Sequence, residues 1–339
     1  MTPLTLGVIG LDHRHAYGMT ENLRRLGCTC AGYWTEGTPE PLEGWQKRFP
    51  DIPRVADRAT LLNDPAIDLI LIADVPALRA DRAIEAMEAG KDVVTDKPGC
   101  TTLDQLARLR AVQARTGRIW SIDFSERFEV PAVTRAAELV AEGAIGRVIQ
   151  TVGLGPHRLN RPMRPDWFFH EESYGGILTD IASHQIDQFL FFTGSEDAEI
   201  VAASVGNFAN PRDPGLQDFG EILLRSDRAQ GYIRVDWYTP DGLPTWGDGR
   251  LTILGTDGYI ELRKYVDIAG RDGTDHLFLV NGDRCERIDA SAAPLPYFER
   301  LVADVRNRTE TAMSQSHCFK AMELALKAQA MATRLGALA

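Results

Sequence analysis

Short apolar runs and helical patterns alternate along the first 123 residues of the chain. The apolar runs are continuous, as in strands covered on both faces, and they fall at Leu4–Gly10, Cys28–Trp34, Ile67–Ala73, Asp92–Thr95 and Ile119–Asp123. The helical segments are each followed by a glycine and span Ala16–Leu26, Ala77–Ala89 and Thr102–Thr116. Because parallel neighbours need a long crossover, this alternation predicts an α/β fold with a doubly wound parallel sheet.

The pattern changes after Asp123, where a helical segment at Pro131–Ala141 is followed by a cluster of strand-like segments. These segments lie at Arg147–Leu154, Ile200–Phe208, Phe219–Leu224, Gly231–Trp237, Leu251–Leu254, Tyr259–Leu262 and His276–Val280. Two helices are expected at the end of the chain, at Tyr297–Asn307 and Gln315–Thr333. We therefore predict two domains: a Rossmann domain at residues 1–123, and an α+β domain with a mostly antiparallel open sheet at residues 124–339.

Length, charge and cysteine usage narrow the class of protein. The 339 residues suit about two domains. The net charge of -11 disfavours nucleic acid and anionic membranes as partners, and no apolar stretch is long enough to span a bilayer. The five cysteines have neither zinc-site nor disulfide spacing, so buried structural thiols are expected. We expect a soluble, cytoplasmic protein without membrane or nucleic-acid partners.

The turn after the first predicted strand is a candidate nucleotide-binding loop. A dinucleotide site requires glycines here, so that the backbone can approach the pyrophosphate at a helix N-terminus. Gly10 matches the first glycine of G-x-G-x-x-G, whereas Asp12 and His15 replace the second and third. His13 and His15 are candidates to donate hydrogen bonds to phosphate. The alternatives are a polar loop with Asp12 as helix cap, or an Asp-His-x-His metal site; we predict no metal.

Two further segments have residues suited to chemistry. Lys97, in Asp96-Lys97-Pro98, directly follows a predicted strand, at the edge where doubly wound sheets bind ligands. In a helix that follows Gly175-Gly176, Asp180, His184 and Asp187 fall on one face. Histidine suits acid–base catalysis because its unperturbed pKa is about 6.5. The alternatives are a lysine in a surface turn and an ordinary solvated polar face.

Together these segments resemble the glucose–fructose oxidoreductase, inositol dehydrogenase and rhizopine catabolism (Gfo/Idh/MocA) family. Its members have a glycine loop after the first strand, a Glu-Lys-Pro near position one hundred and a Gly-Gly-x-x-x-Asp-x-x-x-His-x-x-Asp helix. The resemblance covers nearly the whole chain. This sequence departs from the family by Asp96 in place of glutamate, Ala182 in place of glycine and an eroded glycine loop. Its His-x-His loop is similar to that of a trehalose-utilisation branch that makes 3-keto sugars.

The resemblance implies an NAD(P)-dependent oxidoreductase that oxidises a secondary hydroxyl of a sugar, disaccharide or polyol. It implies that the nicotinamide lies between the domains, with His184 as general base, Lys97 stabilising the alkoxide and Asp180 orienting Lys97 and the substrate. Residues expected to bind the cofactor are Gly10, Leu11, Asp12, His13, His15, Trp34, Glu36, Ala73, Asp74, Pro76, Asp96 and Lys97. Residues expected to bind the substrate, besides Asp180 and His184, are Arg127, Arg158, Arg161 and Trp167; surface ion pairs are the alternative for the arginines.

The second predicted strand ends at Trp34, and Glu36 is the nearest acid that could bind the ribose hydroxyls of NAD. No Arg or Lys follows closely to bind a 2′-phosphate, so NAD is expected, with NADP the alternative. The second domain is expected to bind substrate and to form a homodimer or homotetramer through its sheet. Rival functions are a non-catalytic sensor or regulator of the same fold, NAD-assisted elimination or epimerisation, and a metal-dependent isomerase using His13, His15, Asp180 and His184.

Overall fold

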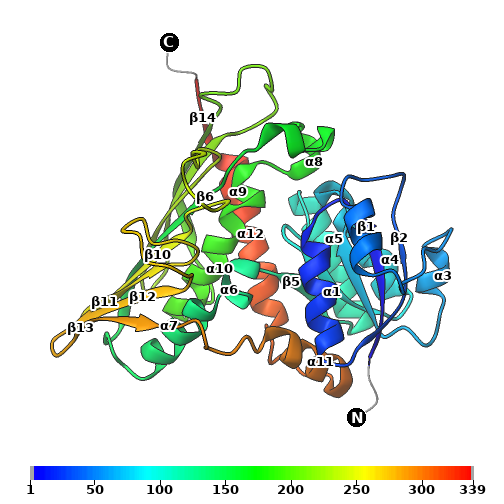
Figure 1. Cartoon of the computed structure of the whole chain (residues 1–339), viewed down its shortest axis with the longest axis horizontal. Helices are drawn as coiled ribbons and strands as arrows, with labels where there is room; N and C mark the ends of the chain where they lie inside the picture. Colours follow the sequence, from blue (N-terminus) through cyan, green and yellow to red (C-terminus); the bar gives the residue numbers. More distant parts are fainter. Residues whose placement is uncertain (1–3, 337–339) are drawn as a thin grey trace. The chain divides into compact units, whose positions relative to one another are not determined.

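The computed structural model describes residues 4–336, and the chain divides into two compact units. The first unit comprises Met1–Asp123, Pro165–Gly175 and Pro296–Met322. The second unit comprises Phe124–Arg164, Gly176–Leu295 and Glu323–Ala339. Each unit is built around its own sheet (Figure 1).

The first unit contains a five-stranded parallel sheet in the order β2-β1-β3-β4-β5. The strands are β1 Thr5–Leu11, β2 Thr29–Trp34, β3 Leu69–Ala73, β4 Asp92–Asp96 and β5 Trp120–Asp123. The helices between them are α1 His15–Arg25, α2 Leu42–Arg48, α3 Ala59–Leu62, α4 Pro76–Glu88 and α5 Leu103–Thr116. The strand order reverses direction between β1 and β3, so the carboxyl ends of these two strands flank the ligand crevice of a doubly wound fold. The predicted doubly wound parallel sheet is confirmed.

Local signals in the sequence set the boundaries of these elements. Every residue of β3 is buried, as its continuous apolar run requires. The Thr102 side chain accepts a hydrogen bond from the Gln105 N–H at 3.1 Å, and α5 stops at Gly117, whose φ is +64°. The short helices α2 and α3 were not expected, because they bury too few side chains to give a helical pattern.

Other parts of the first unit come from later in the chain. They are η2 Asp166–Phe169, α8 Glu171–Tyr174, α11 Tyr297–Asn307 and the first half of α12 Gln315–Met331. Within this unit Tyr297 Oη lies 2.7 Å from Ser121 Oγ, and the Gln315 side chain accepts from the Trp120 N–H at 3.0 Å. These hydrogen bonds attach the late segments to β5.

The second unit contains a nine-stranded sheet in the order β13-β12-β11-β10-β6-β9-β8-β7-β14. Its strands are β6 Val148–Pro156, β7 Glu199–Gly206, β8 Phe219–Arg225, β9 Gln230–Asp236, β10 Arg250–Gly255, β11 Gly258–Arg263, β12 His276–Asn281, β13 Cys285–Asp289 and β14 Thr333–Leu335. Its helices are α6 Ser125–Phe128, α7 Pro131–Ala141, η1 Arg161–Met163, α9 Ile177–Asp180 and α10 Ala182–Thr193. Pairing is antiparallel except at β6–β9 and β7–β14, which confirms the mostly antiparallel sheet.

The structure corrects three details of the sequence analysis. The segment expected to form one helix through Asp180 and His184 is two helices, α9 and α10, separated at Ile181. Its polar face is buried with its apolar face, because nearly all of α10 is enclosed. Cys285 is exposed on β13 rather than buried. Among the residues that the structure describes, no helix combines the length and apolar character needed to cross a membrane.

Candidate active site

The loop between β1 and α1 passes very close to the loop after β3. Gly10 has φ +79°, and a Cβ added there would lie 2.5 Å from the Asp74 nitrogen. The Asp12 and His13 N–H groups both donate to the Ala73 carbonyl, at 2.9 and 3.2 Å. Glycine is therefore required at position 10 by both conformation and space.

The Gly10→Ala variant is expected to lose about 1–3 kcal/mol of stability, because a left-handed backbone is combined with a clash against a neighbouring loop. It should also lose dinucleotide affinity, since the two loops would have to separate. Thermal unfolding and a dinucleotide titration measure these effects. Gly27→Ala is the matched control, because Gly27 has φ +83° but a Cβ added there would meet no atom of the described residues within 4 Å. Equal losses in the two variants would contradict the clash.

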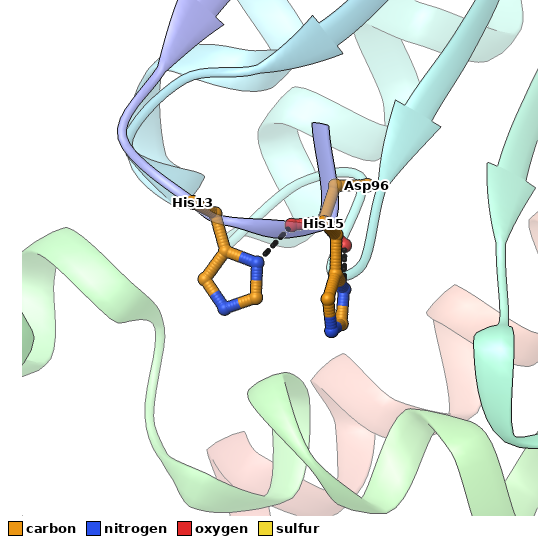
Figure 2. A group of neighbouring side chains, drawn as sticks. All are labelled: His13, His15 and Asp96. Atoms are coloured by element: carbon orange, nitrogen blue, oxygen red, sulfur yellow. Dashed lines mark hydrogen bonds and ion pairs between the residues drawn. The ribbon is translucent and has the colours of Figure 1, made fainter. Parts of the chain in front are cut away.

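His13 and His15 share one buried carboxylate, that of Asp96 (Figure 2). His13 Nδ1 lies 2.9 Å from Asp96 Oδ2, and His15 Nδ1 lies 2.8 Å from Oδ1. The two rings meet edge to face with their centroids 4.3 Å apart. One donor atom from each of the three side chains lies within 4.8 Å of the others, a spacing that a metal ion could also bridge.

Arg79 supplies the positive charge that this carboxylate needs. Its Nη2 lies 3.0 Å from Asp96 Oδ2, and its other nitrogens donate to the carbonyls of Asp74, Lys97 and Pro98. Although burial alone would raise the pKa of Asp96, Arg79 and the two imidazoles hold it well below its usual value. Because the arginine already neutralises Asp96, we interpret the cluster as two imidazoles held against a carboxylate, His15 by a hydrogen bond, rather than as a metal site.

Asp12 and Asp74 form a second carboxyl pair at the same loops. Burial, together with the neighbouring charge of Asp74, raises the pKa of Asp12 to about 7. Arg82 Nε donates to Asp74 Oδ2 at 3.0 Å. The sequence placed both residues in the cofactor site but did not show that they interact.

The end of β2 is more basic than the sequence suggests. The guanidinium groups of Arg58 and Arg82 lie 5.4 and 5.3 Å from the Trp34 ring centroid. Arg54 donates to the carbonyls of Thr35 and Gly37 at 2.9 and 2.8 Å. The segment that directly follows the strand has no arginine, as noted from the sequence, but the fold brings three arginines there from more distant positions.

In the second unit, Asp180 ends α9 and His184 lies in the first turn of α10, and both are buried. The His184 ring lies 6.2 Å from that of Phe124. Arg164 interacts electrostatically with Asp180: burial lowers the pKa of Arg164, and the Asp180 carboxylate opposes that shift. Arg164 was not among the predicted substrate residues, since nothing in its local sequence distinguishes it from its neighbours.

A buried ion pair adjoins His184. Lys264 Nζ lies 2.6 Å from Glu126 Oε2, and Gln185 Nε2 donates to the same oxygen at 3.0 Å. Burial alone would raise the pKa of Glu126, but Lys264, His184 and His157 together lower it to about 2. Glu126 is therefore an anion that fixes the electrostatic environment of both histidines.

The predicted substrate arginines have structural partners. Arg127 Nε and Nη2 each donate to one carboxylate oxygen of Asp187 at 2.7 Å, which forms a buried bidentate ion pair. Arg158 donates to the carbonyls of Pro240 and Leu243, and Arg161 pairs with Asp213. Trp167 is partly exposed on η2, in a segment of the first unit. Their role in substrate binding stays a prediction.

An aromatic cluster was missed from the sequence, because its members come from four separate segments. The His157 ring lies 5.3 Å from Trp237 and 4.6 Å from Trp246, whose ring lies 4.6 Å from Tyr265. Trp246 is 45% exposed, and the Arg164 guanidinium lies over Trp237 at 4.9 Å. His157 also faces Glu126, so the cluster is adjacent to the surroundings of His184.

Comparison with known proteins agrees with this architecture. Residues 7–145 match an oxidoreductase family with an NAD-binding Rossmann fold, and residues 133–261 match the GFO/IDH/MocA C-terminal domain. The chain is 26% identical over 267 residues to scyllo-inositol 2-dehydrogenase (NAD(+)) of Bacillus subtilis (strain 168), covering 75% of this chain and 71% of that protein. It is 28% identical over 204 residues to levoglucosan dehydrogenase of Pseudarthrobacter phenanthrenivorans, covering 59% and 52%.

A solved structure is similar over almost the whole chain. It is the crystal structure of a protein from Erwinia carotovora atroseptica SCRI1043, with a TM-score of 0.95 and 46% identity, and the match covers 98% of this chain and 99% of that one. The two family models together span residues 7–261, and the described fold has both of the expected sheets. The chain belongs to the GFO/IDH/MocA family of oxidoreductases.

Proposed function

We propose that this chain is a cytoplasmic NAD(P)-dependent dehydrogenase that oxidises a secondary hydroxyl of a sugar, disaccharide or polyol. The observation that carries the proposal is the position of Lys97, directly after β4 at the carboxyl edge of the doubly wound sheet. The same chain has Asp180 and His184 enclosed at the junction of α9 and α10. The relatives named above act on an inositol and on levoglucosan, which supports a polyhydroxylated substrate.

The first unit fits a dinucleotide. Gly10 lies at the glycine position of a dinucleotide-binding turn, and it allows the loops after β1 and β3 to approach closely, since a Cβ there would clash with Asp74. Residues proposed to hold the cofactor are Gly10, Leu11, Asp12, His13, His15, Trp34, Glu36, Ala73, Asp74, Pro76, Asp96 and Lys97. A bound nicotinamide supplies the hydride acceptor, and the protein supplies position and charge.

His184 is proposed to remove the hydroxyl proton of the substrate carbinol. Lys97 would donate a hydrogen bond to the same oxygen as negative charge develops there. Asp180 would accept from substrate hydroxyls, with the charge of Arg164 nearby.

The aromatic cluster suits the substrate class. A sugar ring presents C–H groups on one face, and an exposed indole offers a flat apolar surface with low conformational entropy. Trp246 is therefore proposed to contact the substrate, with His157 and Trp237 supporting its position.

A spectrophotometric screen tests the proposed function. The purified protein is incubated with NAD or NADP and a panel of aldoses, disaccharides and inositols, and reduced-cofactor absorbance is followed. We expect cofactor reduction with at least one of the three substrate groups: aldoses, disaccharides or inositols. For that group, Trp246→Ala should raise KM with little change in kcat. Absence of cofactor reduction with every substrate, although the dinucleotide binds, would favour a non-catalytic sensor.

We also propose a homodimer or homotetramer formed through the sheet of the second unit. One face of this sheet covers the core, where Leu251, Ile253 and Ile260 are buried. The opposite face presents partly or fully exposed apolar side chains from six strands: Val152, Leu223, Tyr232, Leu254, Tyr259, Phe278 and Val280. An apolar sheet face of this extent is unusual on a monomer. Light scattering at micromolar concentration should show a multimer, and Leu254→Glu should shift the mass towards the monomer.

A further inference from the structure

Two backbone donors of the nucleotide loop in the first unit are already engaged within the protein. In a glycine-rich loop, backbone N–H groups at the helix N-terminus bind the pyrophosphate. Here the Asp12 and His13 N–H groups both donate to the Ala73 carbonyl. Side chains at the loop are therefore candidates to supply donors in place of these two N–H groups.

The imidazoles of His13 and His15 are placed to do this. Each directs Nδ1 at Asp96, so each Nε2 lies on the side of the ring away from that carboxylate, and Figure 2 shows both pointing in the same direction. Their side chains remain 26% and 36% exposed. A neutral imidazole that donates through Nδ1 presents only a lone pair at Nε2, whereas a protonated one presents an N–H donor.

We propose that His13 binds the diphosphate of the cofactor as an imidazolium ion, with His15 beside it, so that dinucleotide binding takes up protons. This inference rests on the proposed function, because it assumes that the ligand is a dinucleotide. The proton comes from solvent, joins Nε2 of His13 and is balanced by the negative charge of the ligand.

The charges around the loop set the direction of this effect. His13 faces Asp96, His15 and Lys97, and in the free protein burial lowers its pKa to about 4. A bound diphosphate opposes that shift and raises the pKa of His13, which by linkage makes binding tighter as pH falls.

Asp12 acts in the same direction. It faces Asp74, Glu36 and Arg79, and its pKa of about 7 means that it gains negative charge beside the loop as pH rises above that value. A charged Asp12 repels diphosphate, so the ligand favours its protonated form. His13 and Asp12 therefore both favour binding at low pH.

The experiment is calorimetric titration of the full chain with NAD and with ADP-ribose, in EDTA, using two buffers of different ionisation enthalpy. We expect uptake of about one proton per ligand near neutral pH, and a Kd that weakens at least tenfold between about pH 6.5 and 8.5. Adenosine, which lacks phosphate, should cause no proton uptake in the same titration. His170→Asn, a change at an exposed histidine outside the loop, is the control and should retain the wild-type pH dependence.

Two variants show which side chains take up or release the protons. Asp12→Asn should bind ADP-ribose more tightly than wild type above pH 7, because the repelling charge is gone. His13→Gln combined with His15→Gln should weaken binding most at low pH and flatten the profile, since a neutral amide donates without titrating. Circular dichroism checks that each variant is folded.

The outcomes separate the two proposals. Dinucleotide binding with no proton uptake, or a pH profile unchanged in both variants, overturns the inference and leaves the proposed dehydrogenase standing. Failure to bind NAD, NADP or ADP-ribose at any pH overturns both. Stoichiometric binding of Zn²⁺ alone that removes the proton uptake would show a metal site and also overturn the inference.

Discussion

Replacing His184 with asparagine is expected to lower kcat by about 10²–10⁴-fold on whichever sugar or polyol proves to be the substrate, the usual contribution of a general base. Asparagine is smaller than histidine but keeps an amide group near the position of Nδ1, so the buried turn at the start of α10 should remain folded. The measurement is steady-state kinetics at saturating cofactor.

The binding of dinucleotide provides the internal control for this variant, because the proposed cofactor residues belong to the first unit and His184 belongs to the second. Affinity for NAD or NADP should stay within a few-fold of wild type. A variant that keeps near wild-type turnover would remove His184 from the proposed chemistry. A variant that loses cofactor affinity as much as turnover would point to a structural defect.

Replacing Lys264 with methionine is expected to cost about 3–5 kcal/mol of folding free energy, because Glu126 is then left as an uncompensated buried charge. Lys264 and Glu126 are 1% and 2% exposed, so water cannot take over the role of the lost ammonium. Chemical denaturation at neutral pH measures the loss.

The pH dependence of this loss has a definite sign. In wild type the pKa of Glu126 is lowered from 4.5 to about 2, so its contribution to stability is present above pH 4.5 and is lost as pH falls towards 2. In Lys264→Met the same carboxyl should instead take up a proton readily, so the deficit should shrink as the pH is lowered from about 7 to about 5. Combining Lys264→Met with Glu126→Gln should recover much of the lost stability. If Lys264→Met were as stable as wild type, Lys264 would not be the group that compensates the buried charge of Glu126.

Sequence periodicity predicted the parts of the fold where apolar burial is regular. The helices at Pro131–Ala141 and Tyr297–Asn307 have the predicted bounds, and the strands expected at Leu251–Leu254 and Tyr259–Leu262 are found as β10 and β11. Edge strand β13 was missed because none of its residues is fully buried, so its sequence has no alternation to detect. Strand β14 is three exposed residues and gives no signal for the same reason.

The candidate site was predictable as a set of residues but not as a set of contacts. Gly10, Lys97 and His184 stand out through motifs that have a local physical cause. The pairing of His13 with Asp96 joins positions far apart in the sequence, and only the parallel register of β1, β3 and β4 makes it possible. Arg164 and Trp246 lie in irregular segments, where no periodicity indicates which side chains face inward.

Arg79 has a consequence for how this loop can change over evolutionary time. Its one guanidinium donates to the carbonyls of Asp74, Lys97 and Pro98 as well as to the Asp96 carboxylate, so it joins the turns after β3 and β4. A related protein without the arginine would leave the Asp96 carboxylate as an unpaired buried anion beside two histidines. A related protein with glycines in the loop would not need the two histidines to contact phosphate. Arg79, Asp96, His13 and His15 should therefore be substituted together, rather than one at a time, among related proteins.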